Sequence, residues 1–321
     1  MGNPTIGLAL GGGGAKGWAH IGIIKALAEQ GIVPDVVAGT SIGALVGGAY
    51  CAGQLPQLEA WVRDLRWSQV VSLLDVRFSG GLIQGDKVFS QLGMGLEKVG
   101  FEDLAVPFGA VATDLERGTE VWLREGGLMP AIRASAALPG LLSPAKINGQ
   151  WLVDGGLVNP VPVSMCRALG ADFVIAVDLN SNSLSQRSLE EAEPQSEPLT
   201  TETPDELSML DSITQGFGVR NKFYDLLEDM VGKFSASRAA SDKVPSMVDV
   251  AVRSINIMSI RIARSRLAGD PPDILLSPQT GEIGLMEFHR GEEGIALGEA
   301  EMRRQALEIT ALRTVLEASS W

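Results

Sequence analysis

Cysteine and histidine are scarce in this sequence of 321 residues, which contains two of each. Cys51 and Cys166 both lie in apolar or helical surroundings, a pattern typical of small core residues in a reducing compartment. Because His20 and His289 are the only histidines, a mechanism that needs an imidazole has just these two candidates. The choice of a catalytic base is therefore narrow.

The sequence also lacks a hydrophobic run long enough to span a membrane. The longest apolar stretch, residues 244–267, is interrupted by charged residues such as Asp249 and Arg261, which argues against a spanning helix. Residues 1–5 lack the basic and apolar parts of a signal peptide, and Ile6 stands where a myristoylation signal has Ser or Thr. We therefore expect a cytoplasmic protein that is peripheral to a membrane at most.

Basic residues are fewer than acidic ones: the sequence has 26 Lys and Arg and 39 Asp and Glu, which gives a net charge of −13. Nucleic acid and anionic lipid would both repel such a surface. We therefore expect no nucleic-acid partner, and transient membrane contact would have to be local and apolar. With 45% hydrophobic and 20% charged residues, the composition is typical of a globular protein that buries a substantial core.

Strand and helix patterns alternate along the chain and predict an α/β fold. Residues 5–10 form an apolar run that ends in glycines, residues 18–30 have helical spacing, and residues 35–38 form a second strand before the helix at 42–52. This order predicts parallel strands joined by a right-handed crossover. Further strands are expected at 108–113, 120–123, 150–153, 173–177 and 274–276, and further helices at 86–99, 128–134, 162–169 and 292–316.

We expect residues 1–321 to form a single domain that contains a disordered insertion. Residues 181–205 hold six acidic residues and three prolines but no aromatic residue, so they cannot bury enough surface to become ordered. Residues 223–234 follow with apolar side chains at helical spacing, which predicts an amphipathic helix. This helix could pack on the core, join the second subunit of a homodimer, cover the site as a lid or dip into a membrane.

A glycine-rich loop, GGGGAKG at residues 11–17, follows the first expected strand. Its spacing matches a dinucleotide-binding fingerprint, but the second strand ends on Thr40 and Ser41 where that fingerprint needs an acid. A P-loop needs Ser or Thr after Lys16, where Gly17 stands. The third interpretation is an oxyanion hole, because successive glycines let several N–H groups converge beside a helix. We favour the third, since it alone gives the neighbouring serine a role.

Ser41 occupies the centre of the pentapeptide GTSIG, between Gly39 and Gly43. A G-x-S-x-G sequence between a strand and a helix is typical of a nucleophile elbow, whose glycines allow the backbone to approach its neighbours closely. The simpler interpretation is a serine that only caps the helix. The nearby glycine loop favours a nucleophile.

Three side chains could serve as the base for Ser41. His20 lies in the first turns of the helix after the glycine loop, where a structural role is expected. His289 would complete the order of an α/β-hydrolase triad, but only one strand–helix unit precedes Ser41 and charged residues surround His289. Asp154 ends an expected strand and is followed by Gly155 and Gly156, which leave space around it. Burial could raise the pKa of this carboxyl enough to make it a base, so Asp154 is favoured.

The glycine loop, the elbow and the sequence DGG at residues 154–156 resemble the patatin-like phospholipase family in order and spacing. Residues 112–114, 134–140, 157–162 and 271–273 resemble its bacterial branch, which is related to the neuropathy target esterase catalytic domain. The resemblance covers nearly the whole chain except residues 181–205.

This resemblance implies a three-layer α/β/α fold with a mostly parallel central sheet and a Ser–Asp dyad in place of a triad. Ser41 would be the nucleophile and Asp154 the base, and the amides of Gly12, Gly13 and Gly14 would hold the oxyanion. Lys16 occupies the family's basic position in the loop without a catalytic role, and the family implies no metal or other cofactor. The glycines at positions 17, 39, 43, 155 and 156 would support the site.

The expected function is hydrolysis of fatty-acyl esters of phospholipids or lysophospholipids. A serine acyltransferase or thioesterase is the first alternative, although such enzymes usually depend on a histidine partner. A non-catalytic regulator that binds a nucleotide in the glycine loop is the second. The sequence leaves the head group, the chain length and the position of the cleaved ester open.

Overall fold

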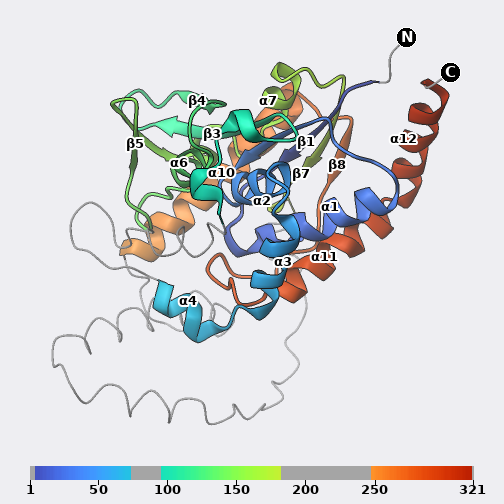
Figure 1. The fold of residues 1–321 in the computed structure, drawn as a ribbon. Coiled ribbons are helices and arrows are strands. Elements are labelled where there is room, and N and C mark those ends of the chain that lie inside the picture. Colours follow the sequence, from blue (N-terminus) through green and yellow to red (C-terminus); the bar gives the residue numbers. More distant parts are fainter. Residues whose placement is uncertain (1–3, 74–94, 182–246, 320–321) are drawn as a thin grey trace, which may run out of the picture.

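The computed structural model describes residues 4–73, 95–181 and 247–319 (Figure 1). The helix expected at 223–234 lies outside these residues, as does the expected insertion at 181–205 apart from Ser181. No helix among the described residues is both long enough and apolar enough to cross a membrane.

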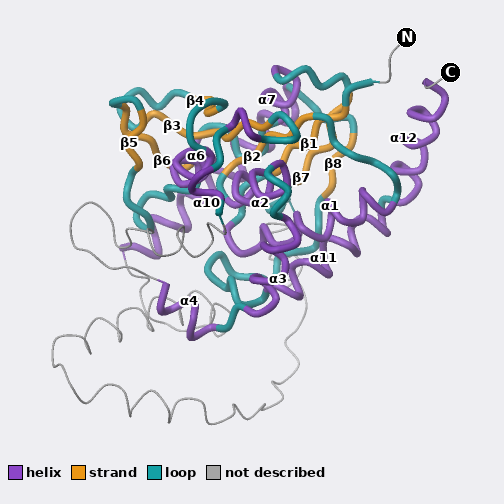
Figure 2. The backbone as a smooth tube through the Cα atoms, viewed as in Figure 1, coloured by secondary structure: helices purple, strands orange, loops and turns teal. Residues whose placement is uncertain are grey.

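The described residues form one eight-stranded sheet with the strand order β5-β6-β3-β2-β1-β7-β8, and β4 pairs with β3 (Figure 2). Five strands run parallel: β1 (Ile6–Leu10), β2 (Val36–Thr40), β3 (Phe108–Asp114), β7 (Phe173–Val177) and β8 (Ile274–Leu276). The other three form antiparallel pairs: β4 (Glu120–Leu123) and β6 (Gln150–Asp154) with β3, and β5 (Ala145–Ile147) with β6. The expected α/β fold with a mostly parallel sheet is confirmed.

Helices cover both faces of the sheet, because the side chains of its central strands are apolar on both faces. Leu8 and Leu10 of β1 pack against α1 (Ala19–Glu29), α2 (Ile42–Cys51) and α11 (Gly291–Arg304). Ala9, between them, faces the opposite layer, which contains α7 (Val163–Ala168) and α10 (Met247–Gly269). The result is the expected three-layer arrangement, in which Cys51 and Cys166 are buried core residues.

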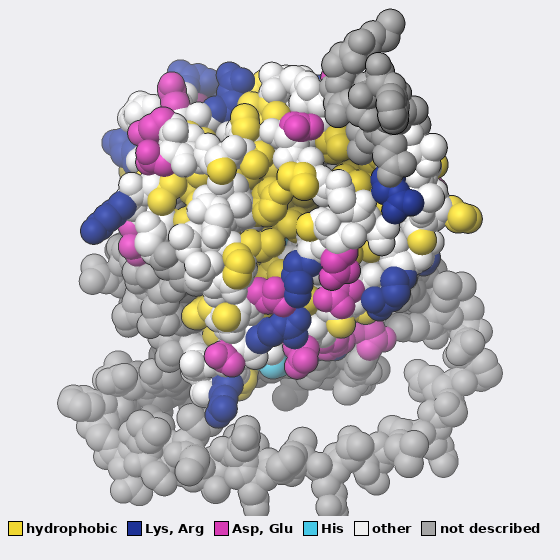
Figure 3. Space-filling model, turned by 45° about the vertical axis from the view of Figure 1, so that its right-hand side comes forward, with side chains coloured by type: hydrophobic (Ala, Val, Ile, Leu, Met, Phe, Trp, Pro, Cys, Tyr) yellow, Lys and Arg dark blue, Asp and Glu magenta, His cyan; other side chains and the backbone are white. Residues whose placement is uncertain are grey.

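The remaining described elements lie around these layers. They are η1 (Gly14–Trp18), α3 (Leu55–Asp64), α4 (Trp67–Leu73), η2 (Leu96–Lys98), η3 (Phe101–Asp103), α6 (Leu128–Ser135), η4 (Gly155–Leu157) and α12 (Ala306–Ser319). Figure 3 shows acidic and basic side chains interspersed below a run of hydrophobic side chains on one face. Among the ion pairs of the described residues, Glu59 of α3 pairs with Lys25 of α1 and with Arg63.

The strand pairing brings two strand ends together on one edge of β3. Thr40, the last residue of β2, pairs with Val111, while Asp154, the last residue of β6, pairs with the next residue, Ala112. Val111 and Ala112 also pair with β4, which therefore occupies the other edge. Because β2 runs parallel to β3 and β6 runs antiparallel, their carboxyl ends meet, and Ser41 follows directly after Thr40.

Two of the sequence predictions about helices are corrected by the structure. The single helix expected at 292–316 is two helices, α11 and α12, which are separated at Gln305. The helix expected at 86–99 falls mostly outside the described residues, and its described end is a turn at Gly95, with φ 93°, followed by η2. The strands expected at 120–123, 173–177 and 274–276 are confirmed residue for residue, whereas β5, α3, α4 and α10 had not been expected.

The contact between α1 and α11 depends on glycines, and Figure 1 shows the two helices side by side. A Cβ at Gly298 of α11 would collide with the backbone oxygen of Ala19 on α1, and one at Gly22 of α1 would collide with the backbone oxygen of Ile295. These glycines therefore allow the two backbones to approach closely across the layer that packs beneath the glycine loop.

We expect Gly298→Ala to destabilise the protein by about 1–3 kcal/mol, because the added methyl group must push α1 and α11 apart. Gly269→Ala is the control, since a Cβ at Gly269, the last residue of α10, meets no atom within 4 Å. Chemical denaturation of both variants measures the difference. An equal effect on both would contradict the close contact.

Candidate active site

Ser41 stands at the sharp turn between β2 and α2. Its φ of 57° and ψ of −122° are unusual for a residue that has a side chain, and such strain persists only where the surroundings enforce it. The Ser41 amide donates to Ser135 Oγ at 2.9 Å, and Ser135 Oγ donates to the carbonyl of Val111 at 2.5 Å. The turn is therefore tied to β3 through a serine of α6.

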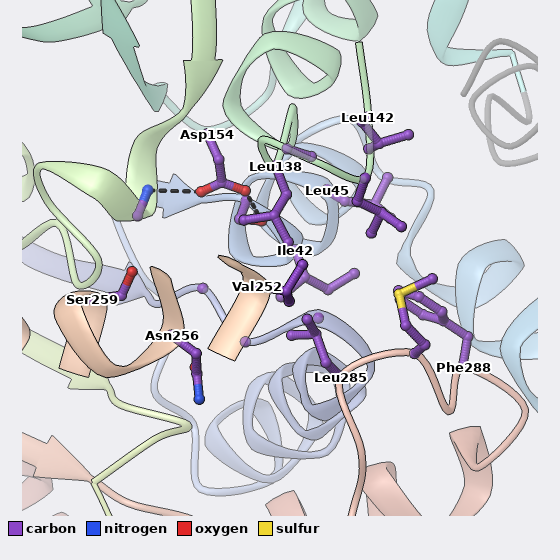
Figure 4. Close-up of a pocket in the computed structure, with 18 of the residues that line it drawn as sticks. Ile42, Leu45, Leu138, Leu142, Asp154, Val252, Asn256, Ser259, Leu285 and Phe288 are labelled. Atoms are coloured by element: carbon purple, nitrogen blue, oxygen red, sulfur yellow. Dashed lines mark hydrogen bonds between the residues drawn. The ribbon is translucent and has the colours of Figure 1, made fainter. Parts of the chain in front are cut away.

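Asp154 lies directly against this serine. Ser41 Oγ donates to Asp154 Oδ2 at 2.6 Å, and the Gly156 amide donates to Asp154 Oδ1 at 2.7 Å (Figure 4). The backbone of Asp154 is fixed as well, because its amide donates to Ala137 O and its carbonyl accepts from Thr113 Oγ1 at 2.8 Å. Each carboxylate oxygen thus has one defined donor.

Burial controls the protonation of Asp154, whose exposed fraction is 4%. Desolvation raises the pKa of Asp154 from 3.8 to about 6, although the hydrogen bonds from Ser41 and Gly156 lower it. At neutral pH the carboxyl is therefore ionised, yet it is a much stronger base than an exposed carboxylate.

The glycines of the elbow and of the DGG sequence allow the close approaches on which this geometry depends. A Cβ at Gly39 would collide with the backbone of α2, and one at Gly43 would collide with the backbone of Leu10. A Cβ at Gly155 would collide with the carbonyl of Val111, and one at Gly17 with the side chain of Ile42. Larger residues at these positions would move the turn away from the sheet.

The glycine loop lies beside the serine, and a Cβ at Gly12 would be 3.4 Å from Ser41 Cβ. Of the three expected oxyanion donors, the Gly12 amide already donates to Pro160 O at 3.0 Å. Among the described residues, the amides of Gly13 and Gly14 have no acceptor in the protein. Gly14, with φ 58°, adopts a backbone conformation that favours glycine.

Ser41 and Asp154 open into a cavity of about 180 Å³ that also contains Gly12, Gly13 and Gly14. Its walls are mainly aliphatic and aromatic, with Ile42 and Leu45 from α2, Leu285 and Phe288 before α11, and Val252 from α10 (Figure 4). Apart from Asp154, the lining side chains of the described residues carry no charge. Such a cavity can accommodate an alkyl chain with its reacting carbonyl group at Ser41.

The comparisons with known proteins agree on one family. Residues 8–167 match the family described as patatin-like phospholipase. An NTE family protein of Mycobacterium tuberculosis is 34% identical over 337 residues, which span 95% of this chain and 92% of that protein. The chain belongs to the patatin-like phospholipase family. NTE family proteins are thus among the relatives of this patatin-like protein over nearly its full length.

Other relatives share less of their length with this patatin-like protein. Lysophospholipase NTE1 of Mycosarcoma maydis is 36% identical over 192 residues, which span 55% of this chain but 10% of that protein. Among solved structures, VipD from Legionella pneumophila matches with a TM-score of 0.42 and 12% identity, over 99% of this chain and 67% of that one.

Both histidines of the patatin-like protein are held by contacts with surrounding residues. His20 is fully buried, its Nε2 lies 2.8 Å from the carbonyl oxygen of Gly11, and burial lowers its pKa to about 4. His289 packs edge-on against Trp67 and is not among the residues that line the cavity. Burial also lowers the pKa of His289. Among the described residues, no group of three or more His, Cys, Asp or Glu side chains could hold a metal ion.

Several residues that shape the site were not expected from the sequence. Asn180, just after β7, forms two hydrogen bonds with the glycine loop, one with the carbonyl of Gly12 and one with the side chain of Lys16. The unexpected helix α10 lines the cavity with Asn256 and Ser259 (Figure 4). For Asn180 a signal did exist, because polar residues that follow a parallel strand next to β1 lie at the carboxyl edge where ligands bind.

We expect Asp154→Asn to gain stability relative to the wild type as the pH rises. The pKa of this carboxyl is higher in the folded protein, about 6, than the ordinary 3.8, so its contribution is fully present below pH 4 and is lost as the pH rises through 6. Asparagine does not titrate. The free energy of unfolding should therefore shift in favour of the variant by up to about 3 kcal/mol between pH 4 and pH 8.

Asp114→Asn is the matched control for this measurement. The backbone amide of Arg117, its guanidinium and the amide of Glu116 hold the pKa of Asp114 below its usual range. The contribution of this carboxylate is therefore lost only in acid, below about pH 4, so its variant should show no comparable gain over the wild type between pH 4 and pH 8. Denaturant titrations from pH 4 to pH 8 compare the two, and the same slope for both would refute the role of burial at Asp154.

Proposed function

We propose that this protein is a serine acyl hydrolase that cleaves fatty-acyl esters through a Ser41–Asp154 dyad. The 2.6 Å hydrogen bond from Ser41 Oγ to Asp154 Oδ2 is the observation that carries the proposal. It joins a hydroxyl on a strained elbow to a carboxyl that burial makes more basic, which is the arrangement that activates a nucleophile.

In the first half of the reaction, Ser41 Oγ attacks the carbonyl carbon of the ester and its proton passes to Asp154 Oδ2. The carbonyl oxygen gains the negative charge, and the amides of Gly13 and Gly14 are suited to hold it. The tetrahedral intermediate then collapses, the bond to the alcohol breaks, and the leaving oxygen takes the proton from Asp154. The product of this half is an acyl ester on Ser41.

In the second half, water replaces the alcohol. Asp154 accepts a proton from the water as its oxygen attacks the acyl carbon, and the oxyanion again lies on the glycine loop. Collapse of this intermediate breaks the ester bond, Ser41 Oγ recovers its proton from Asp154, and the fatty acid leaves. The Gly156 amide, at 2.7 Å from Oδ1, keeps the carboxylate oriented in both halves.

The cavity and the relatives together support a lipid substrate. The aliphatic and aromatic walls beside Ser41 suit a fatty-acyl chain, and the relative from Mycosarcoma maydis is named a lysophospholipase. We therefore propose lysophospholipids as the main substrates, with diacyl phospholipids as the second class. An acyltransferase would use the same acyl-enzyme and differ only in the acceptor, so the products distinguish the two reactions.

We expect Ser41→Ala to abolish labelling by a fluorophosphonate probe and Asp154→Asn to lower kcat by about 10⁴. His289→Ala should remain within threefold of the wild type, because this histidine lies outside the cavity. The rate with a soluble ester, kcat/KM, should rise with pH with an apparent pKa near 6, since only ionised Asp154 accepts the proton. A large loss in His289→Ala with full activity in Asp154→Asn would reverse the assignment of the base.

We expect mass spectrometry of a mixed lipid panel to show free fatty acid released faster from lysophosphatidylcholine than from phosphatidylcholine. Ser41→Ala gives the background. The same incubation with an added long-chain alcohol tests the acyltransferase, because transfer would produce a new ester at the expense of free fatty acid. Unchanged lipids, together with a melting temperature that rises when NAD or ATP is added, would favour a nucleotide-binding regulator instead.

A further inference from the structure

The orientation of the glycine loop is decided by the groups that donate hydrogen bonds to its carbonyl oxygens. In a planar trans peptide, the C=O of one residue and the N–H of the next point in opposite directions. A group that holds the carbonyl of Gly12 therefore also determines where the amide of Gly13 points. A Gly–Gly peptide has little intrinsic preference between its two orientations, so this restraint must come from outside the loop.

Asn180 supplies that restraint. Its Nδ2 donates to the carbonyl oxygen of Gly12 at 3.0 Å. The side chain is itself held in one orientation, because Lys16 Nζ donates to Asn180 Oδ1 at 3.2 Å. An ammonium group can bond only to the oxygen of the side-chain amide, so its NH₂ group must face Gly12. The Asn180 backbone amide donates to Asp178 Oδ1 at 2.9 Å and fixes the segment beneath it.

The preceding peptide is held in the same way by another side chain. His20 Nε2 lies 2.8 Å from the carbonyl oxygen of Gly11, and the Gly12 amide on the other side of that peptide donates to Pro160 O at 3.0 Å. Burial lowers the pKa of His20 to about 4, so the ring stays neutral at physiological pH. The Gly12 amide is therefore already occupied, and the next one, at Gly13, borders the cavity with no protein acceptor among the described residues.

The geometry points to Asn180 as the positioning residue of the oxyanion hole. Its side chain holds the Gly12–Gly13 peptide so that the Gly13 amide is available to the oxygen that gains charge when Ser41 attacks. Lys16 acts one step further away, by orienting the amide of Asn180. This inference rests on the proposed hydrolase, and it assigns a role to a residue outside the glycine loop, the elbow and the DGG sequence.

The test compares Asn180→Leu and Asn180→Asp with the wild type in hydrolysis of a soluble short-chain ester. Both variants lack the donor to Gly12, and the aspartate retains the contact with Lys16. Direct loss of an oxyanion donor costs about 10²–10³ in kcat, so loss of a positioning residue should cost roughly 10- to 100-fold. KM should change less than threefold, because the ester in its ground state does not use the Gly13 amide fully.

A long-chain alkyl trifluoromethyl ketone supplies a readout that mere loosening of the fold would not move. Ser41 Oγ adds to its carbonyl carbon, the proton passes to Asp154, and the oxygen becomes an oxyanion in the same position. Affinity for this ketone should fall in parallel with kcat/KM across the variants, as it does for transition-state analogues. Affinity that stays at the wild-type level while kcat falls would overturn the role of Asn180.

Thr280→Val is the matched control. Thr280 is buried, and its Oγ1 donates to the carbonyl of Leu179, the residue before Asn180, at 2.9 Å. Thr280 thus supports the segment that carries Asn180 but does not bond to Gly12. It should lower the melting temperature and leave kcat within threefold. An equal loss of kcat in Thr280→Val would assign the effect to the stability of the segment and overturn the inference.

Two further outcomes separate this inference from the proposed function. A rise in KM with unchanged kcat in the Asn180 variants would make Asn180 a substrate contact, and wild-type kcat in them would remove its role altogether, while the hydrolase itself stands. If the wild type shows no ester hydrolysis that depends on Ser41, the proposed function fails and the inference fails with it. If Asn180→Leu does not fold, Asn180→Asp, which preserves the shape of the side chain, decides.

Discussion

The hydrogen bond between the hydroxyl of Ser41 and the buried carboxyl of Asp154 is the interaction on which the rest of the structure depends. A buried carboxylate is costly, and here it has one hydroxyl and one backbone amide as donors. The cost appears as the raised pKa of Asp154. The sheet holds Ser41 and Asp154 together, because β2 and β6 end opposite neighbouring residues of β3. Moving either residue away from the other would disturb the pairing of its strand with β3.

The positions of the glycines follow from the same constraint. The turn at Ser41 must lie close to the sheet, so Gly43 lies against Leu10 of β1, and the glycine loop must lie close to that turn, so Gly12 lies against Ser41. The helix after the loop must then pack tightly on its neighbour, which is achieved by Gly298 on α11. At each of these positions glycine has no side chain, whereas any other residue would separate the elements that position Ser41 and Asp154.

The sequence predicted the features that are encoded locally. Strand–turn–helix patterns predicted β1, β2 and the elbow, and the residue after each strand end identified Ser41 and Asp154. The position of Asn180 after a strand indicated the carboxyl edge of the sheet, but its hydrogen bond to Gly12 could not be predicted, because the two residues lie 168 positions apart and only the pairing of β1 with β7 brings them together. The break at Gln305 was also missed, because the apolar periodicity continues through it and carries no glycine or proline to mark the boundary.

A carboxylate without an imidazole can serve both halves of the proposed reaction without rearrangement. Asp154 presents Oδ2 to the serine and keeps Oδ1 on the Gly156 amide. After acylation Ser41 Oγ no longer carries a proton, so Oδ2 is free to accept one from water while Oδ1 keeps its donor. A histidine would have to hold one tautomer through both steps, with a third residue to orient it. Here the backbone of a DGG turn fulfils that orienting role, which explains how a site with neither histidine at its cavity can still be complete.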